Sequence, residues 1–170
     1  MKRILFIYHV SSIGGGSYCL LNILKTINRT KYQPTVLLRK DGPLCDEIRK
    51  LNIKVYLLSS IRTVPYNTSI FKINSIRTVV SIFYSMGEYG RLLDNIKPDL
   101  VYINTMMMYP YLKAAKVRGI KTAIHIREHW PKNEHKIQRK IAVAKIQKEA
   151  DQVIAINTYS ATIVPQKVLP

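Results

Sequence analysis

The stretch KRILFIYHVSSIGGGS, residues 2–17, decides the fold of this chain. Residues 4–10 form an apolar run rich in β-branched and aromatic side chains, which predicts a strand buried on both faces of a parallel sheet. The turn Gly14, Gly15, Gly16 and Ser17 follows, and an amphipathic helix is expected next, with residues 20, 21, 24 and 27 on its apolar face. The bare N–H groups at the start of such a helix favour an anion, typically phosphate.

The rest of the chain repeats this alternation of strand and helix. Further strands are predicted over residues 34–39, 53–58, 98–104, 121–127 and 152–156. Helices are predicted over 44–51, 70–96, 106–119 and 133–150, with a last one from Thr158 into Pro165 and a loop over 59–69. In the helix over 70–96, Ile73, Ile76, Val80 and Phe83 are expected to face inward. Gly87 and Gly90 are expected to interrupt this helix. The sequence therefore predicts one α/β domain, a Rossmann-like doubly wound parallel sheet of six to seven strands with helices on both faces.

The amino-acid composition indicates which kinds of molecule this protein is expected to bind. The formal net charge of the 170 residues is +17, which predicts affinity for nucleic acid, phospholipid head groups or phosphorylated small molecules. Cys19 and Cys45 form no CxxC motif, as expected of a reduced, cytoplasmic protein. The N-terminal apolar run is short for a signal peptide and lacks a cleavage site, and no run reaches the roughly 20 residues of a membrane span. We therefore expect a chain that is neither exported nor inserted in a bilayer.

The glycine turn allows three interpretations. It can be a purely structural turn, or a contact for a phosphate or an acceptor. It also approximates the dinucleotide pattern G-x-G-x-x-G/A, with Gly14, Gly16 and, in the third position, Cys19 as a small residue in place of glycine or alanine. The second strand ends in Arg39, Lys40 and Asp41, so that pattern would indicate an NADP-type site.

A second set of candidates follows the fifth strand, in HIREHWP at residues 125–131. If the strand continues, His125, Arg127 and His129 share one face and Glu128 lies on the other. Two histidines and an arginine suit an anionic substrate, and a histidine or Glu128 can serve as proton acceptor. No third metal ligand accompanies the histidines, so no metal is expected. The alternative is an ion-paired, hydrogen-bonded loop without a catalytic role.

Asn104 and Thr105 follow the fourth strand and can contact a ligand through amide and hydroxyl groups. Thr105 can equally cap the helix that begins at Met106. The methionines of that helix are expected to pack in the core.

The helix over 133–150 has a basic character. It carries lysines and an arginine at 132, 136, 139, 140, 145 and 148, with Ile137, Ile141 and Ala144 expected to form its apolar face. This charge run predicts a solvated face, or a surface that docks on anionic lipid or a phosphorylated substrate. We expect no specific nucleic-acid partner, because zinc-finger spacing and RNP-type aromatic patterns are missing from the sequence.

Several segments occur in a telling order: KRILFI (2–7), GGGS (14–17), IKPDLVYIN (96–104), AAKVRGIK (114–121) and EADQVIAIN (149–157). Together they resemble the N-terminal half of glycosyltransferase family 4 enzymes, which have the GT-B fold. The resemblance implies retaining transfer of a sugar from a nucleotide-sugar, which is a co-substrate, without a metal or another cofactor. In that family the N-terminal domain mainly recognises the acceptor, while a second domain binds most of the donor.

The resemblance also implies site residues. Gly15, Gly16 and Ser17 match the turn that lies against the donor phosphates, and Arg127-Glu128 aligns with the family's polar residues beyond strand five. The catalytic candidates are therefore His125, Arg127, Glu128 and His129. Gly14, Gly15, Gly16, Ser17, Asn104 and Thr105 are the candidates for substrate or donor-phosphate contact. The family's donor-binding half, with its paired glutamates, has no counterpart in residues 1–170, so this half is expected to fold without turning over.

The resemblance implies a role in bacterial surface-polysaccharide synthesis, with a glycan or lipid-linked acceptor. The basic surface and the helix over 70–86 would then rest on the anionic inner face of the plasma membrane. Two alternatives remain: an NADP-binding reductase domain, and a non-catalytic basic module that binds phosphorylated polymers.

Overall fold

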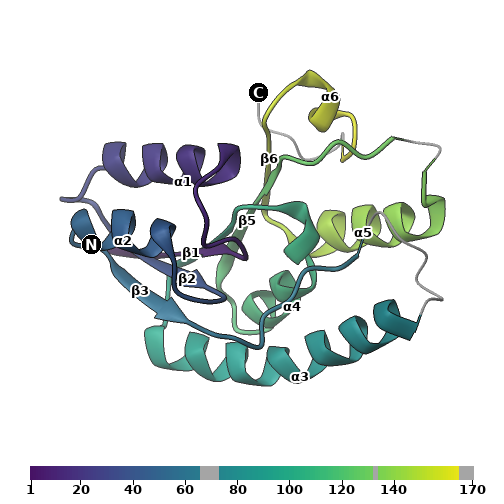
Figure 1. The fold of residues 1–170 in the computed structure, drawn as a ribbon, viewed down its shortest axis with the longest axis horizontal. Coiled ribbons are helices and arrows are strands. Elements are labelled where there is room, and N and C mark those ends of the chain that lie inside the picture. The colour runs from purple at the N-terminus through teal and green to yellow at the C-terminus, as the bar shows by residue number, and fades with distance from the viewer. Residues whose placement is uncertain (66–72, 132–133, 165–170) are drawn as a thin grey trace.

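The computed structural model describes residues 1–65, 73–131 and 134–164, and for residues 73–76 it describes the backbone alone. It contains one sheet of six parallel strands in the order β3-β2-β1-β4-β5-β6 (Figure 1). The strands are β1 (Lys2–Tyr8), β2 (Tyr32–Leu38), β3 (Lys54–Leu57), β4 (Leu100–Ile103), β5 (Lys121–Ile126) and β6 (Gln152–Ala155). The helices are α1 (Gly15–Thr26), α2 (Pro43–Lys50), α3 (Ile73–Ile96), the 3₁₀ turn η1 (Met106–Met108), α4 (Pro110–Lys116), α5 (Lys136–Glu149) and α6 (Thr158–Ala161).

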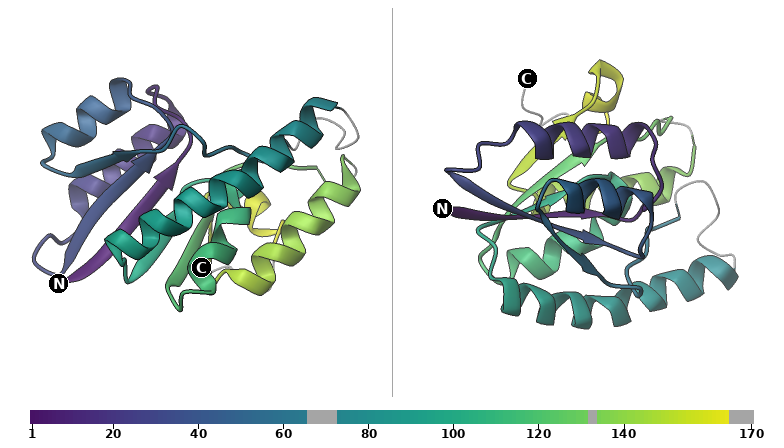
Figure 2. Two further views of the ribbon diagram at one scale, coloured as in Figure 1. Left: turned by 90° about the horizontal axis from the view of Figure 1, so that it is seen from below. Right: turned by 60° about the vertical axis from the view of Figure 1, so that its left-hand side comes forward.

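The sheet lies between two helical layers, as Figure 2 shows most directly. Helices α1 and α2 cover one face, and α3, α4 and α5 cover the other. Strand β1 supplies both cores, because Ile4 and Phe6 point to the first layer while Leu5 and Ile7 point to the second. The predicted Rossmann-like, doubly wound fold is therefore confirmed, with six strands.

Helix α3 differs from its prediction in two ways. Its inward face consists of Ile82, Ser85, Tyr89 and Leu93, whereas Val80 is 63% and Phe83 71% exposed. The predicted apolar face was thus wrong for these two residues, and the side chains of Ile73 and Ile76 lie outside the described residues.

The glycines of α3 do not interrupt it. The helix runs unbroken from residue 73 to residue 96. Gly90 packs against the guanidinium of Arg118, and a Cβ at this position would displace that group, so this glycine permits the close contact. Nothing lies close enough to Gly87 to be displaced by a Cβ.

Two other predictions need correction. The helix expected over 106–119 is divided into η1 and α4, because Pro110 begins a new helix. Helix α4 ends at Lys116, earlier than predicted, and Gly119 lies beyond it in the left-handed region (φ 69°). On α5 the buried residues are Gln138, Ala142, Ile146 and Glu149, so Ile137, Ile141 and Ala144 form no buried face. The positions 66–69, 70–72, 132–133 and 165, which the sequence assigned to a loop and to helix ends, lie outside the described residues.

Within residues 1–65, 73–131 and 134–164, no helix is both long enough and apolar enough to cross a membrane.

Candidate functional site

The candidate site lies where the strand order reverses. Strands β1 and β4 are neighbours, while the chain leaves β1 toward β2 on the other side. Loops at the carboxyl ends diverge at such a point, which leaves room for ligands. The carboxyl end of β5 and the segments after β1, β4 and β5 lie at this edge, and they carry the ten residues that the sequence singled out.

The glycine turn forms the first turn of α1. Gly14 is its N-cap and provides no side-chain cap, so the N–H groups of Gly15, Gly16 and Ser17 point out of the helix end. The hydroxyl of Ser17 donates to the carbonyl oxygen of Ser12 at 2.7 Å and is buried. Ser17 therefore closes the turn with its side chain and can offer a ligand only its backbone N–H.

Gly16 must be glycine for a steric reason. A Cβ at this position would overlap the hydroxyl of Tyr8 and would approach Cδ of Arg127 to 3.9 Å. Tyr8 is the last residue of β1, and burial raises the pKa of its hydroxyl, an effect that Arg127 partly offsets. The turn is thus packed between one tyrosine and one arginine.

Asn104 joins the glycine turn to the tip of β5. It is fully buried, and its side-chain amide donates from Nδ2 to the carbonyl oxygen of Gly16 at 3.1 Å. Its Oδ1 accepts a hydrogen bond from Nε of Arg127 at 3.1 Å. One amide therefore holds two of the predicted regions together.

Arg127 has further contacts. Its Nη2 lies 3.1 Å from Nδ1 of His125, which must be the acceptor because a guanidinium only donates. Its Nη1 is buried and has no hydrogen-bond partner among the described residues. An unpaired buried guanidinium nitrogen is costly, so its presence beside the turn is the strongest local indication that this place suits an anion.

Glu128 is held by three hydrogen bonds from its neighbours. Its Oε1 accepts a hydrogen bond from the hydroxyl of Thr105, and its Oε2 accepts from the backbone N–H groups of Met106 (3.1 Å) and Arg127 (3.0 Å). Both carboxylate oxygens are thus engaged in fastening the tip of β5 to that of β4. The oxygen of Thr105 also accepts from Met107 N, so the alternative prediction that Thr105 caps this turn is confirmed.

His125 lies beneath the tip, only 6% exposed, with its Nδ1 also 2.6 Å from the hydroxyl of Tyr102. Burial, and then the charge of Arg127, lower the pKa of His125 to about 4. The imidazole is therefore neutral at physiological pH and serves as an acceptor for Arg127.

His129 does not join the other candidates. Its ring stacks on Tyr159 of α6 with centroids 4.3 Å apart. The prediction that His129 shares a face with His125 and Arg127 was wrong, because β5 ends at Ile126 and strand alternation does not extend to residue 129.

Tyr8 and Tyr102 were not among the sequence candidates. Both are the partners of candidates, Tyr8 of Gly16 and Tyr102 of His125. A signal was available, because Tyr8 follows Phe6 by two residues at the carboxyl end of β1 and so occupies the same face.

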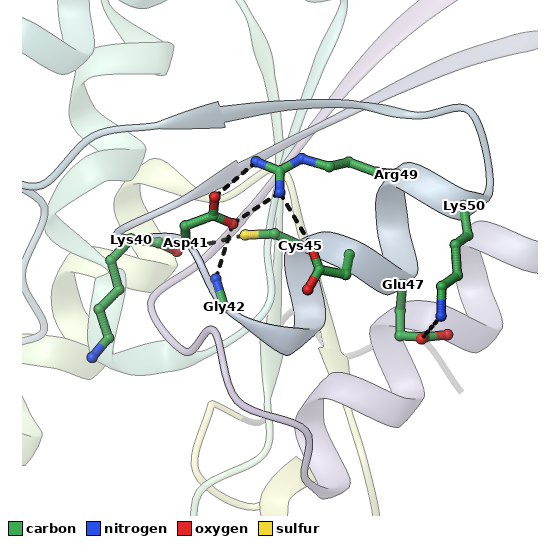
Figure 3. A network of polar contacts seen from close by, with 8 residues as sticks. Lys40, Asp41, Gly42, Cys45, Glu47, Arg49 and Lys50 are labelled. Atoms are coloured by element: carbon green, nitrogen blue, oxygen red, sulfur yellow. Dashed lines mark hydrogen bonds and ion pairs between the residues drawn. The ribbon is translucent and has the colours of Figure 1, made fainter.

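The position that a dinucleotide enzyme needs after β2 is occupied by a different contact. Asp41 accepts from both terminal nitrogens of Arg49, at 3.0 and 3.2 Å, and from the N–H of Gly42, as Figure 3 shows. These contacts hold the pKa of Asp41 below its usual value, the hydrogen bond from Arg49 being the main cause. Asp41 thus fixes the start of α2, which disfavours its use as a ribose ligand.

The described part of the chain contains no cluster of three His, Cys, Asp or Glu side chains that could hold a metal ion.

The buried histidine makes a prediction about pH. The folded state keeps His125 neutral down to about pH 4, whereas the unfolded chain protonates it near 6.5. The folded state therefore binds fewer protons in this window, and stability decreases as pH falls from 6.5 toward 4. Between pH 7 and pH 5 we expect His125 to account for a loss of about 2 kcal/mol.

Denaturant unfolding at pH 7 and pH 5 checks this expectation. The variant His125→Asn should lose less stability than the wild type over the same interval. His9 contributes with the same sign, because burial, and then the charge of Arg39, lower its pKa to about 4. The dependence should therefore be reduced and not abolished, and an unchanged slope in His125→Asn contradicts the prediction.

Comparison with known proteins gives similarity in structure alone. No family model matches the chain, and no curated protein is matched by its sequence. Among solved structures, HepE from Anabaena in complex with UDP-glucose is similar with a TM-score of 0.71 and 20% identity; the match covers 99% of this chain and 43% of that one.

Two further structures are similar over the whole chain. WaaB, a lipopolysaccharide outer core galactosyltransferase, matches with a TM-score of 0.63 and 18% identity over 100% of this chain and 45% of its own. The UDP-GlcNAc 2-epimerase from Neisseria meningitidis, bound to UDP-GlcNAc, matches with a TM-score of 0.60 and 14% identity over 99% and 45%.

These structural matches establish a shared fold, that of one half of a GT-B architecture. Sequence identities this low leave the reaction open. The chain spans less than half the length of each of these proteins.

Proposed function

We propose that this chain is the acceptor-side half of a retaining, nucleotide-sugar-dependent glycosyltransferase of family 4 that acts in bacterial surface-polysaccharide synthesis. The acceptor is a glycan or a lipid-linked glycan. The observation that carries the proposal is the buried, unpaired Nη1 of Arg127 beside the glycine turn.

The chemistry of that site suits a diphosphate. The N–H groups of the first turn of α1 and the dipole of this helix favour negative charge. Arg127 adds a formal positive charge and a free donor. Since the leaving group of a nucleotide-sugar is a diphosphate, donors fixed here would stabilise the charge that develops as the sugar departs.

The residues around Arg127 have supporting roles in this proposal. Asn104 sets the distance between the turn and the guanidinium, and His125 accepts from its other side. Glu128 and Thr105 fasten the two strand tips. We expect no resident metal or other cofactor, because the guanidinium and the helix N-terminus supply the positive charge.

The proposal includes a second domain. The chain covers 43–45% of the similar proteins, so we propose that another half supplies most of the donor site and closes a cleft over this edge. A half-cleft exposes the reacting groups to water, and residues 1–170 alone are then expected to be inactive.

The test is an activity assay on the whole gene product. The protein is incubated with a panel of radiolabelled nucleotide-sugars and bacterial lipid extract, and labelled glycolipid or glycan is quantified. Product that depends on a nucleotide-sugar supports the proposal. Saturable binding of NADPH would favour the reductase, and steeply salt-dependent RNA binding without a response to any nucleotide-sugar would favour the basic module.

We also propose that the protein associates peripherally with the inner face of the plasma membrane. Its net charge is +17, and the exposed side of α3 carries Val80, Phe83 and Tyr84, which are 63–74% exposed. Apolar side chains on a basic protein are the combination that binds anionic interfaces.

Vesicle co-sedimentation measures this association. The wild type should pellet with vesicles of phosphatidylglycerol and much less with phosphatidylcholine alone. Val80→Ser/Phe83→Ser should reduce the pelleted fraction severalfold, because each apolar group buried at an interface contributes favourably. Val117→Ser removes an equally exposed apolar side chain elsewhere and should have no effect. Equally weak pelleting with both lipids contradicts the proposal.

A further inference from the structure

A second pocket lies on the same edge of the sheet as the candidate site, at the carboxyl ends of β2 and β3. Its volume is about 600 Å³, and one wall comes from α3. Its lining consists of Arg39, Lys40, Ser59, Ser60, Arg62, Tyr84 and Glu88. None of these residues is used by the site described above.

The pocket carries an excess of positive charge. Its lining contains three cationic side chains and a single carboxylate, that of Glu88. Among the described residues, no ion pair engages Arg39, Lys40 or Arg62.

The neighbouring carboxylate of Asp41 pairs with Arg49 and does not neutralise the cations of the pocket. It is held by Arg49, and the side chain of Lys40 runs away from that pair (Figure 3). The guanidinium of Arg62 donates to the carbonyl oxygens of Ser59 and Ile61, which fixes the loop beside the pocket and keeps its charge there. Three cations that no ion pair neutralises, one of them fixed in a concave surface, attract an anion.

The pocket is adjacent to the glycine turn. His9, the residue after β1, is close to both: its ring lies 5.1 Å from that of Tyr8, and its pKa is lowered by burial and then by the charge of Arg39. Strand β2 is next to β1 and β3 is next to β2, so the pocket lies roughly 5–10 Å along the sheet from the turn. This separation suits a second anionic group that is bound together with a donor diphosphate.

We infer that this pocket binds the phosphate or diphosphate group of the acceptor. The inference rests on the proposed function, since it assigns the first anion site to the donor. The exposed ring of Tyr84 at the wall offers an apolar face next to the cations, which suits an acceptor that carries both charge and apolar surface. The acceptor is thus a phosphorylated one, and its phosphate can belong to a lipid carrier or to a sugar phosphate.

Titration calorimetry of the 170-residue chain tests this assignment. The probes are inorganic pyrophosphate, farnesyl diphosphate and glucose 1-phosphate, each at fixed ionic strength. The double variant Arg39→Gln/Lys40→Gln should weaken binding of the preferred probe by about tenfold or more, because two charge-assisted contacts are lost. The swap Arg39→Lys/Lys40→Arg keeps both charges and should retain binding within a few-fold.

The matched control is Arg29→Gln/Lys31→Gln. It removes the same charge from exposed positions at the opposite, amino edge of the sheet, where neither residue forms an ion pair in the described part of the chain. Equal losses in the control and in the pocket variant would mean that the probes sense only net charge, which overturns the inference. Absence of binding by all three probes also overturns it.

The probes distinguish the sources of the phosphate. Tighter binding of farnesyl diphosphate than of pyrophosphate indicates a lipid carrier, and tighter binding of glucose 1-phosphate indicates a sugar phosphate. The nucleotide-sugar assay of the whole gene product is independent of this titration. Transfer activity that persists in the pocket variant with unchanged KM for the acceptor refutes the pocket while leaving the glycosyltransferase proposal intact.

Discussion

Replacement of Arg127 by alanine is expected to lower kcat/KM for sugar transfer by about a hundredfold or more in the whole enzyme. The guanidinium is the only described side chain that contacts Asn104 and His125 at once and also has a buried, unpaired nitrogen. Its removal deletes a donor aimed at the proposed diphosphate. It also releases Asn104, which otherwise holds the carbonyl oxygen of Gly16.

Two variants sharpen this experiment. Arg127→Lys keeps the charge but cannot donate to Asn104 and a ligand with a planar fork, so an intermediate loss is expected. Arg91→Ala removes an exposed arginine of α3 and should leave kcat/KM unchanged. If Arg127→Ala retains full activity while its unfolding free energy is unaltered, the guanidinium is not part of the donor site.

Replacement of Glu128 by alanine is expected to lower the free energy of unfolding by about 2–3 kcal/mol. The variant leaves the N–H groups of Met106 and Arg127 and the hydroxyl of Thr105 without their acceptor. The two strand tips then lose the carboxylate that holds them together. Denaturant unfolding monitored by circular dichroism gives the free energy directly.

The comparison variants separate this role from simple loss of charge. Glu128→Gln keeps one oxygen acceptor and should lose about half as much stability. Glu47→Ala breaks only the exposed pair with Lys50 and should change stability by less than about 0.5 kcal/mol. A loss in Glu128→Ala no greater than that in Glu47→Ala would show that the tip does not depend on this carboxylate.

The sequence pattern was sufficient to locate the strands of the sheet, but it did not predict which faces of the outer helices are buried. Buried parallel strands are continuous apolar runs, and β1 and β4 could be located from such runs alone. Helix α3 offered two competing stripes of similar apolarity. The stripe that packs inward includes Ser85, whose hydroxyl lies 2.7 Å from that of Tyr111, and no pattern within α3 could indicate this partner in α4.

The predicted buried face of α5 was wrong for a related reason. Its inward face contains Gln138 and Glu149, polar residues that a sequence pattern assigns to solvent. Its isoleucines at 137 and 141 are exposed instead. The buried side of such a helix is decided by the neighbouring elements, which local periodicity does not encode.

The sequence predicted where the candidate residues lie better than it predicted what each of them contacts. Parallel topology brings the ends of β1, β4 and β5 to one edge, so Gly16, Asn104 and Arg127 could be grouped from the sequence. The bonds among them could not, because Asn104 bridges partners 88 and 23 residues away. The engagement of Glu128 with η1 and the stacking of His129 on α6 depend on where β5 ends.

The way in which α3 is anchored determines which of its positions can change without loss of the fold. The helix is about 36 Å long, and its contacts are unevenly divided. Toward Ile96 it is fixed by the buried Leu93, by the seat of Gly90 on Arg118 and by the two bonds from Arg118 to Asp94. In the middle of the helix, Phe83 and Tyr84 are exposed, and Tyr84 lines the pocket beyond β2 and β3. These exposed positions can therefore change their side chains without loss of core packing, while the contacts toward Ile96 keep the helix in place on the sheet.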